Sequence, residues 1–489
     1  MSDLKQIDVL GEKEVGILSE SQLSHSDDDS QILEWTAAEE KALVRKTDFI
    51  IMPLLMLGFF SLQVDRGNIA NALTDNFLAD VGITQFQFNI GQQLLSAGIV
   101  ILEIPSNLLL FQFGPTIWIG SQIMVWGFIA TFQAFIKGKG LGPYLTTRLL
   151  LGLCEAGFIP AGLYTITKWY KREETAKRFA IFFIGMMASA ASTGLIAFGI
   201  LRMRGICGLS GWQWIFLIEG MFTVLVGATF LSFFPHSPGN PVSLLKYRYF
   251  SERESQLILR RVLLDDPTKS ETRKHIPWSE VKAVLTNWTL IPHILLILCC
   301  MSPIQAIGNY GPLLIISFGF DKLKSNAMGT IGAWLMLLGN VLFGFLADRF
   351  GVRGPLVLLV VTIFTAMVLA NRFLVESHDG NLRFAFLTLA VAFSAAWHPI
   401  HGAWIALNAR SAGQRSITMA VFIMAANLAG VIGGQMFQAE DAPLYKTGWA
   451  AIVGLVAVGL LSAIVANLQY VFLNRRQAKD GEKRFLYSH

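Results

Sequence analysis

Twelve long apolar stretches, separated by short polar segments, run through the sequence from about residue 48 to residue 472. About 20 apolar residues are enough for a helix to cross the roughly 30 Å hydrocarbon core of a bilayer. The stretches are too long and too uniformly apolar for strands of a membrane barrel, so they predict helices. The predicted spans are 48–71, 88–111, 116–136, 142–167, 178–200, 213–234, 289–316, 327–347, 355–373, 384–407, 416–438 and 449–472.

A polar and charged segment at 235–288 separates the first six spans from the last six. We therefore expect an all-α membrane protein with two six-helix bundles, at 48–234 and 289–472, joined by this central loop. Residues 1–47 include an acidic, serine-rich run, which is typical of a disordered tail. Residues 473–489 are expected to form a second tail.

The distribution of charge gives an orientation for these spans. Only 15% of the residues are charged, against about 25% in soluble domains. Most of the 39 Lys and Arg residues lie on the side of the predicted membrane that holds both termini. Because positive loops stay in the cytoplasm, both termini are predicted to be cytoplasmic. We expect a multi-pass protein of the plasma membrane, with an organelle membrane as the alternative.

Few ionisable side chains lie inside the predicted spans. Each is a candidate functional group, because charge within a bilayer is costly. At a rise of about 1.5 Å per residue, Asp65 and Arg148 lie at similar depths in the first and fourth spans. Glu155 lies about two turns below Arg148 on roughly the same face. The set comprises Asp65, Arg66, Glu103, Arg148, Glu155, Glu219, His293, His398 and His401.

This combination of charges is typical of anion transport. An arginine in a low-dielectric cavity binds a carboxylate, and a buried carboxyl group can take up and release a proton. Arg66 and Arg148 are therefore candidate substrate-binding residues, whereas Asp65 and Glu155 are candidate proton-coupling residues. A structural ion pair that orders the bundle is the alternative interpretation.

The second half offers neutral and titratable candidates. His398 and His401 lie one helical turn apart in the tenth span, and histidine titrates near neutral pH, so either could bind substrate or accept a proton. Asn309 and Tyr310 of the seventh span and Asn427 of the eleventh are candidate hydrogen-bonding groups in a cavity. Ordinary packing and hydrogen bonding are the alternative for all five.

Two segments resemble motifs of the major facilitator superfamily. The run GFLADRFGVR at 344–353 resembles its signature loop, and RLLLGLCEAGFIP at 148–160 resembles its helix 4 motif. The resemblance implies two six-helix bundles that rock around a central cavity. It also implies gating roles for Asp348, Arg349 and Arg353.

More narrowly, the chain resembles the fungal allantoate permease family of anion:cation symporters over about residues 45–472. The resemblance implies that Asp65, Arg66 and Glu155 form the proton and substrate machinery, with Arg148 as the associated arginine. The matching segments are 45–53, DRGNIANA at 65–72, EIPSNL at 103–108, GWQWIFLIEG at 211–220 and DAPLYKTG at 441–448.

One segment departs from the superfamily pattern. The loop FQFGPT at 111–116 lacks the basic residues of the first signature copy. We therefore expect the inward-closed state to depend on the copy at Asp348 and Arg349, and we expect Asp348→Asn and a charge change at Thr116 to have opposing effects on the populations of the two states.

The sequence thus predicts proton-coupled uptake of a small organic anion, such as a carboxylate, vitamin or ureide, by alternating access. A proton gradient would supply the energy without a cofactor, and we expect a monomer. Export of a metabolite or drug-like compound by the same fold is the alternative, and a sensor that binds without transporting is a third. The sequence holds no nucleotide-binding loop, zinc motif or hydrolase triad, so we expect no enzyme, metal site or nucleic-acid partner.

Overall fold

The computed structural model describes residues 35–265, 278–409 and 412–479 of a chain that divides into two units, Met1–Ala42 and Leu43–His489. Of the first unit, the described part contains the start of helix α1 (Ala37–Ala72). The backbone N–H of Thr36 donates to Glu39 at 3.0 Å, and that of Glu39 donates to the Thr36 hydroxyl at 3.2 Å. This reciprocal cap begins the helix before the predicted span boundary at residue 48.

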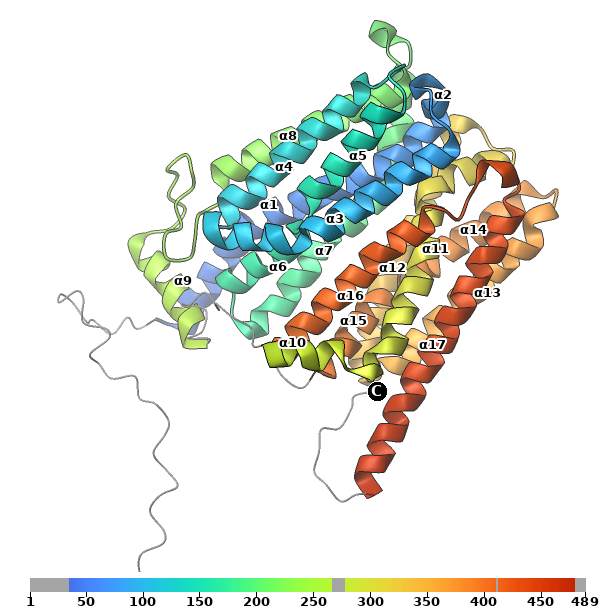
Figure 1. Ribbon diagram of the computed structural model, residues 1–489. Coiled ribbons are helices and arrows are strands. Elements are labelled where there is room, and N and C mark those ends of the chain that lie inside the picture. Colours follow the sequence, from blue (N-terminus) through green and yellow to red (C-terminus); the bar gives the residue numbers. More distant parts are fainter. Residues whose placement is uncertain (1–34, 266–277, 410–411, 480–489) are drawn as a thin grey trace, which may run out of the picture. The chain divides into compact units, whose positions relative to one another are not determined.

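Helices make up most of the second unit (Figure 1). Each of the twelve predicted spans coincides with one helix or with two helices separated by a short break. The first half contains α1, α3 (Gln85–Phe113), α4 (Pro115–Phe132), α5 (Leu141–Glu155) with α6 (Phe158–Trp169), α7 (Arg172–Ile200) and α8 (Gly211–Phe233). The second half contains α11 (Ile291–Ser317), α12 (Lys322–Phe350), α13 (Gly354–Phe373), α14 (Gly380–Ser394) with α15 (His398–Leu407), α16 (Ala412–Gly433) and α17 (Lys446–Lys479).

Ten of these segments, within the described residues, are long and apolar enough to cross a membrane. Helix α3, with 29 residues, and α16 complete the set of twelve. The fold class predicted from the apolar stretches is therefore confirmed. The segment between α8 and α11 forms two shorter helices, α9 (Glu252–Asp265) and α10 (Trp278–Leu285), and neither is among the ten.

Glycines allow close contact between α4 and α8 in the first half. A Cβ on Gly127 of α4 would lie 2.8 Å from the backbone nitrogen of Val224 in α8. A Cβ on Gly220 of α8 would lie 2.5 Å from the backbone nitrogen of Thr131 in α4. Apolar burial does not drive helices together within lipid, so such close backbone approach supplies the van der Waals contact that holds α4 against α8.

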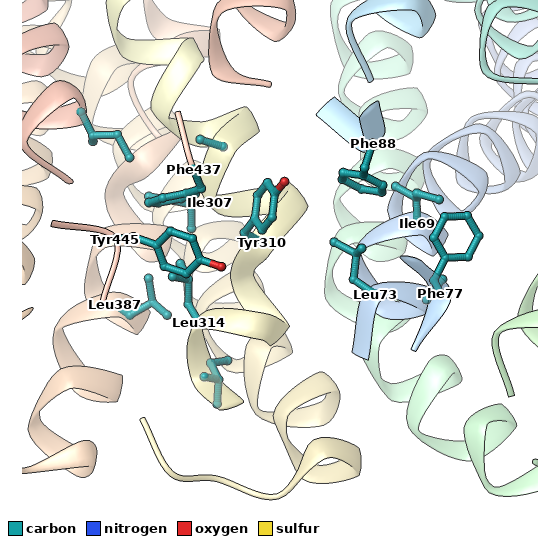
Figure 2. Packing of buried hydrophobic residues seen from close by; sticks show 14 of the residues in the cluster. Ile69, Leu73, Phe77, Phe88, Ile307, Tyr310, Leu314, Leu387, Phe437 and Tyr445 are labelled. Atoms are coloured by element: carbon teal, nitrogen blue, oxygen red, sulfur yellow. The ribbon is translucent and has the colours of Figure 1, made fainter. Parts of the chain in front are cut away.

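An aromatic cluster joins the two halves at the end of the bundle where α1 and α11 finish and α3 and α12 begin. The ring centroid of Tyr310 in α11 lies 6.0 Å from that of Phe88 in α3 and 5.6 Å from that of Phe437. Figure 2 shows Tyr310 and Phe437 of the second half facing Phe88, Ile69 and other residues of the first. Aromatic pairs at these separations add to the attraction between the halves.

Hydrogen bonds reinforce this contact. Tyr310 donates its hydroxyl proton to the side-chain oxygen of Asn89, and the Asn89 amide donates to the Phe437 carbonyl oxygen at 3.2 Å. The Asn326 amide of α12 donates to the Thr74 hydroxyl at 3.1 Å. We call the region of these five residues the closed end. Further side-chain hydrogen bonds between the halves, from Gln85 to the Phe437 carbonyl oxygen and from Gln93 to the Val431 carbonyl oxygen, lie at or near this end.

Ion pairs hold the first half together at the opposite end. The guanidinium of Arg178 in α7 binds both carboxylate oxygens of Asp48 in α1, at 2.9 and 2.7 Å. Lys46 of α1 pairs with Glu254 of α9 at 2.8 Å. The second of these pairs joins α9 to α1 of the first half.

Candidate functional site

The fourth predicted span is broken immediately after Glu155. Ala156 is extended and Gly157 has a positive φ of 80°, which favours glycine, before α6 begins. The Gln122 amide donates to the Ala156 carbonyl oxygen at 2.8 Å, and Glu103 accepts the backbone N–H of Gly157 at 3.2 Å. Side chains thus satisfy the backbone groups that the break releases, as irregular backbone at membrane depth requires.

An ion pair lies at this break. The Nε of Arg66 in α1 donates to the Oε2 of Glu155 at 2.6 Å. The Glu155 side chain is fully buried, whereas that of Arg66 is 25% exposed. The structure therefore brings together two of the residues that the sequence predicts for the site.

Arg148 lies in α5, two turns before Glu155, and is buried. Its Nη2 donates to the Gln92 side-chain oxygen at 2.5 Å and its Nη1 to that of Gln133 at 3.5 Å, while its Nε has no partner. In the part of the chain that the structure describes, no carboxylate lies within 4.0 Å of its nitrogens. Neutral amides orient the guanidinium without neutralising its charge, so the charge remains available to an anion.

Asp65 faces a different neighbour from Arg66. Its Oδ2 accepts the Thr223 hydroxyl of α8 at 2.9 Å, and it does not pair with Arg148. Successive helix residues point about 100° apart, so Asp65 faces α8 whereas Arg66 faces α5. Asp65 and Arg148 were predicted to lie at similar depths, which made a pair between them possible. In the structure, Arg66 pairs with Glu155 instead, and Asp65 binds Thr223.

A cavity of about 410 Å³ lies between the two halves, and both halves line it. Asn326, which binds Thr74 at the closed end, also lines the cavity, so the closed end forms one wall. Among the described lining residues, Arg66 and Arg148 alone carry a charge. The amide side chains of the lining are those of Gln63, Asn71, Gln92, Gln305, Asn309, Asn326 and Asn427. A cavity of this size is typical of small-molecule sites.

The structure separates the neutral candidates of the second half. Asn309 and Asn427 line the cavity, as a substrate-binding role requires. Tyr310 instead lies at the closed end and donates to Asn89. Its hydroxyl therefore joins the halves, and its predicted contact with substrate stays a prediction.

The two predicted histidines lie within the second half and do not line this cavity. His401 Nε2 lies 2.8 Å from His293 Nδ1, and His293 Nε2 lies 3.0 Å from the Tyr470 hydroxyl. His293 and His401 are fully buried and His398 is partly buried, and all three lie among aromatic rings. This arrangement suits an internal hydrogen-bonded cluster, and a binding role for it stays a prediction.

The predicted gating residues lie at the end of the bundle opposite the closed end. Arg349 is exposed in the last turn of α12, and Arg353 directly precedes α13. The side chain of Asp348 lies outside what the structure describes. Thr116 of the first loop donates to the Pro235 carbonyl oxygen at 3.0 Å. A gating role for Asp348, Arg349 and Arg353 stays a prediction.

Sequence reasoning missed the neutral partners of the charged groups. Gln92 and Gln133 orient Arg148, Gln122 supports the break, and Thr223 binds Asp65. Each is a polar residue in an otherwise apolar span, and that signal could have identified them because buried polar groups need hydrogen-bond partners. The sequence identified Glu103 as a charged residue within a span, but did not predict that it accepts a hydrogen bond from the backbone N–H of Gly157.

Comparison with known proteins gives a consistent result. The model of the Major Facilitator Superfamily matches residues 55–434. An uncharacterized transporter of Saccharomyces cerevisiae is 28% identical over 450 residues, covering 90% of this chain and 82% of the relative. An uncharacterized transporter of Schizosaccharomyces pombe is 27% identical over 441 residues, which cover 90% of this chain and 84% of the relative. The crystal structure of a bacterial homologue of the human lysosomal transporter Spinster is similar in fold, with a TM-score of 0.66 at 15% identity, covering 86% of this chain and 96% of that one.

Proposed function

We propose that this chain, which belongs to the Major Facilitator Superfamily and is a membrane transporter of that type, carries a small organic anion together with protons. The observation that carries the proposal is the cavity lining, where Arg66 and Arg148 are the charged residues among those described. Guanidinium groups bind carboxylates through paired, charge-assisted hydrogen bonds. We therefore propose a carboxylate, vitamin or ureide-like cargo and a place in the allantoate permease branch.

Coupling to protons follows from the Arg66–Glu155 pair, whose atoms lie 2.6 Å apart. An anion that binds Arg66 competes with Glu155 for the same guanidinium. Glu155 then loses its counter-charge in a fully buried position, and an unpaired buried carboxylate takes up a proton because its ionised form is poorly solvated. The anion and the proton thus favour each other's binding, which is the thermodynamic requirement for symport. Asp65 is proposed as the second proton-coupling residue.

The halves are tied at the closed end, so we propose that this conformation opens toward the end that carries the termini. With both termini in the cytoplasm, the conformation is inward-facing, and transport alternates between it and a state that is open at the present closed end. We propose a monomer in the plasma membrane, with an organelle membrane as the alternative, that uses the proton gradient and needs no cofactor.

A matched pair of ligands tests the charge requirement. Nicotinate and nicotinamide have nearly the same shape, but only nicotinate is an anion at neutral pH. A panel of such acid–amide pairs, added to purified protein, is expected to raise the melting temperature for acids only. A ligand at 100 times its Kd stabilises the folded state by about 2.7 kcal/mol.

Arg148→Met removes the charge and keeps much of the side-chain volume. We expect it to weaken binding of the acid by about 30- to 5,000-fold, because losing one partner of a buried charge pair costs about 2–5 kcal/mol. Arg202→Met removes an arginine outside the cavity lining and is the matched control. Equal binding of acid and amide, or unchanged acid binding by Arg148→Met, would overturn the proposed function.

A further inference from the structure

Glu219 of α8 is a buried acid that the mechanism above does not use. It is 3% exposed, and neither of its carboxyl oxygens has a hydrogen-bond partner among the described residues. An ionised carboxylate in this position would lack both solvent and a counter-ion. Such a group is stable only when it is neutral, which means that it holds a proton.

The charged group that interacts with Glu219 is a second acid. Thr223 lies four residues after Glu219 and shares its helix face, and the Thr223 hydroxyl donates to Asp65 at 2.9 Å. Asp65 is 1% exposed, and Trp126 of α4 also acts on its carboxyl group. Glu219 and Asp65 interact electrostatically. The two carboxyl groups therefore face the same contact between α1 and α8.

Among the described residues, the other elements packed against α8 provide no cation that pairs with Glu219. Helix α4, its principal neighbour, contains no Asp, Glu, Lys, Arg or His. The ionisable residues of α7 lie in its first two turns, within 172–178. In the short turns that follow α1 and α7, Asp75 pairs with Arg204, and Arg202 lies over the Phe198 ring. Asp65 is thus the titratable group that acts on Glu219.

Hydrogen bonding identifies the protonated acid. The described interior of the first half holds three fully buried carboxyl groups, those of Asp65, Glu155 and Glu219. Glu155 accepts from Arg66 and Asp65 accepts from Thr223, whereas Glu219 accepts nothing among the described residues.

We propose that Glu219 and Asp65 form a proton-binding site on the α8 side of α1, with the proton on Glu219 in this conformation. Transfer of the proton from the Glu219 carboxyl group to the Asp65 carboxylate leaves Glu219 ionised and Asp65 neutral, so the total charge is unchanged. Asp65 and Arg66 are neighbours in α1. A movement of α1 that accompanies cargo binding therefore alters the proton site and the Arg66–Glu155 pair together.

A proton fits this site better than a metal ion does. Glu219, Asp65 and Thr223 supply the oxygen atoms, and these residues are fewer than the six to eight oxygen ligands that a hard cation such as Ca²⁺ takes. Neither acid lines the cavity between the halves. The role of this proton site in transport rests on the proposed function, anion symport.

Infrared spectroscopy of the protein in lipid nanodiscs tests the site without any cargo. At neutral pH, the wild type is expected to show the carbonyl band of a protonated carboxylic acid, shifted by deuterium. Glu219→Gln keeps the shape of the side chain and is expected to lose that band. Glu103→Gln is the matched control, because Glu103 accepts a hydrogen bond from Gly157 and is expected to contribute no such band.

Absence of the band in the wild type, or its persistence in Glu219→Gln, would overturn the inference. Loss of the wild-type band on adding Na⁺ at constant pH would also overturn it, in favour of a cation site. If Glu219→Gln does not fold, Glu219→Asp keeps an acid but shortens the side chain. The band is then expected to remain with a shifted pH midpoint, and an unchanged midpoint would contradict the assignment.

Transport measurements separate this inference from the proposed function. In proteoliposomes, Glu219→Gln is expected to exchange a labelled carboxylate across the membrane but to lose accumulation driven by a proton gradient. Accumulation equal to that of wild type would overturn the role of Glu219 and leave anion symport intact. If the wild type moves no carboxylate, the proposed function fails, while the infrared result still decides whether Glu219 holds a proton.

Discussion

Gly194 of α7 allows the two halves to meet at the closed end. A Cβ at this position would lie 2.3 Å from the backbone oxygen of Asn326 in α12 and 2.8 Å from a methyl group of Thr330. The carbonyl group belongs to a helix and cannot rotate away. Gly194→Ala therefore forces α7 and α12 apart in this conformation, but carries no such penalty in a state where the halves have separated here.

The size of the effect follows from this geometry. Real Cβ atoms do not approach other heavy atoms within 3.0 Å, so the helices must separate by roughly 1 Å or the chain must deform. Overpacking of this kind costs about 1–3 kcal/mol. A difference of that size between the two conformations shifts their equilibrium by about 5–150-fold.

Cysteine labelling measures this shift. Ala70 lines the cavity, and an Ala70→Cys variant in a Cys207→Ser background would react with a membrane-impermeant maleimide applied at the closed end. We expect Gly194→Ala to increase the labelling rate about 5–150-fold. Gly430→Ala would bring a Cβ to 2.6 Å from the Ser96 hydroxyl, which can rotate, so a smaller increase is expected.

Two further glycines of α7 serve as controls. A Cβ on Gly199 would meet nothing within 4 Å, so Gly199→Ala should leave the labelling rate unchanged. A Cβ on Gly185 would lie 2.4 Å from the Met56 carbonyl oxygen within the first half, so Gly185→Ala should reduce stability without opening the closed end. Equal labelling of Gly194→Ala and Gly199→Ala would refute the assignment of this contact to the closed end.

Three other predictions test separate parts of the structure. Gly157→Ala combines a φ of 80° with a Cβ 2.5 Å from the Ser106 hydroxyl and should lower the free energy of unfolding by about 1–3 kcal/mol in thermal melts, unlike Gly142→Ala, whose Cβ meets nothing. Cys207 is exposed beyond α7, so impermeant maleimide should label it in intact cells if the termini are cytoplasmic, and labelling only after permeabilisation would reverse the orientation. Burial acts to raise the pKa of Asp80, but hydrogen bonds from Trp212 and Ser210 and the charge of Lys137 outweigh it and leave the pKa below the usual 3.8. The ionised Asp80 therefore stabilises the fold above pH 3.8, and this stabilisation is lost as the pH falls through the lowered pKa. The melting temperature of Asp80→Asn should therefore change less than that of the wild type over this acidic range. An equal change in both proteins would contradict the assigned role of Asp80.

The apolar stretches were sufficient to predict the fold class, because a bilayer imposes a minimum length on each helix. The cost of burying charge likewise singled out Arg66, Arg148 and Glu155 as candidates, and the structure pairs Arg66 with Glu155 and places both arginines on the cavity wall. Neither argument fixes how far a helix is rotated about its axis. Asp65 and Arg66 point about 100° apart, and only packing against α8 and α5 decides which of them meets Glu155.

Long-range partners were also outside the reach of sequence patterns. The spacing of His398 and His401 places them near one another, but His401 meets His293, a partner 108 residues away. That contact depends on the packing of α11 against α15, which no local pattern specifies. The break after Glu155 had a local signal, since Gly157 and Pro160 interrupt the fourth span, but the side chains that support the break come from α3 and α4.

Gradient-driven uptake into proteoliposomes tests the central claim that the arginine-lined cavity moves an anion with protons. Labelled carboxylates would be offered to wild type, Glu155→Gln and the matched control Glu103→Gln, with and without an inward proton gradient. The account predicts that the gradient drives accumulation of at least one carboxylate by wild type and Glu103→Gln, but not by Glu155→Gln. Movement that ignores the gradient in all three, or accumulation that Glu155→Gln retains in full, would contradict it.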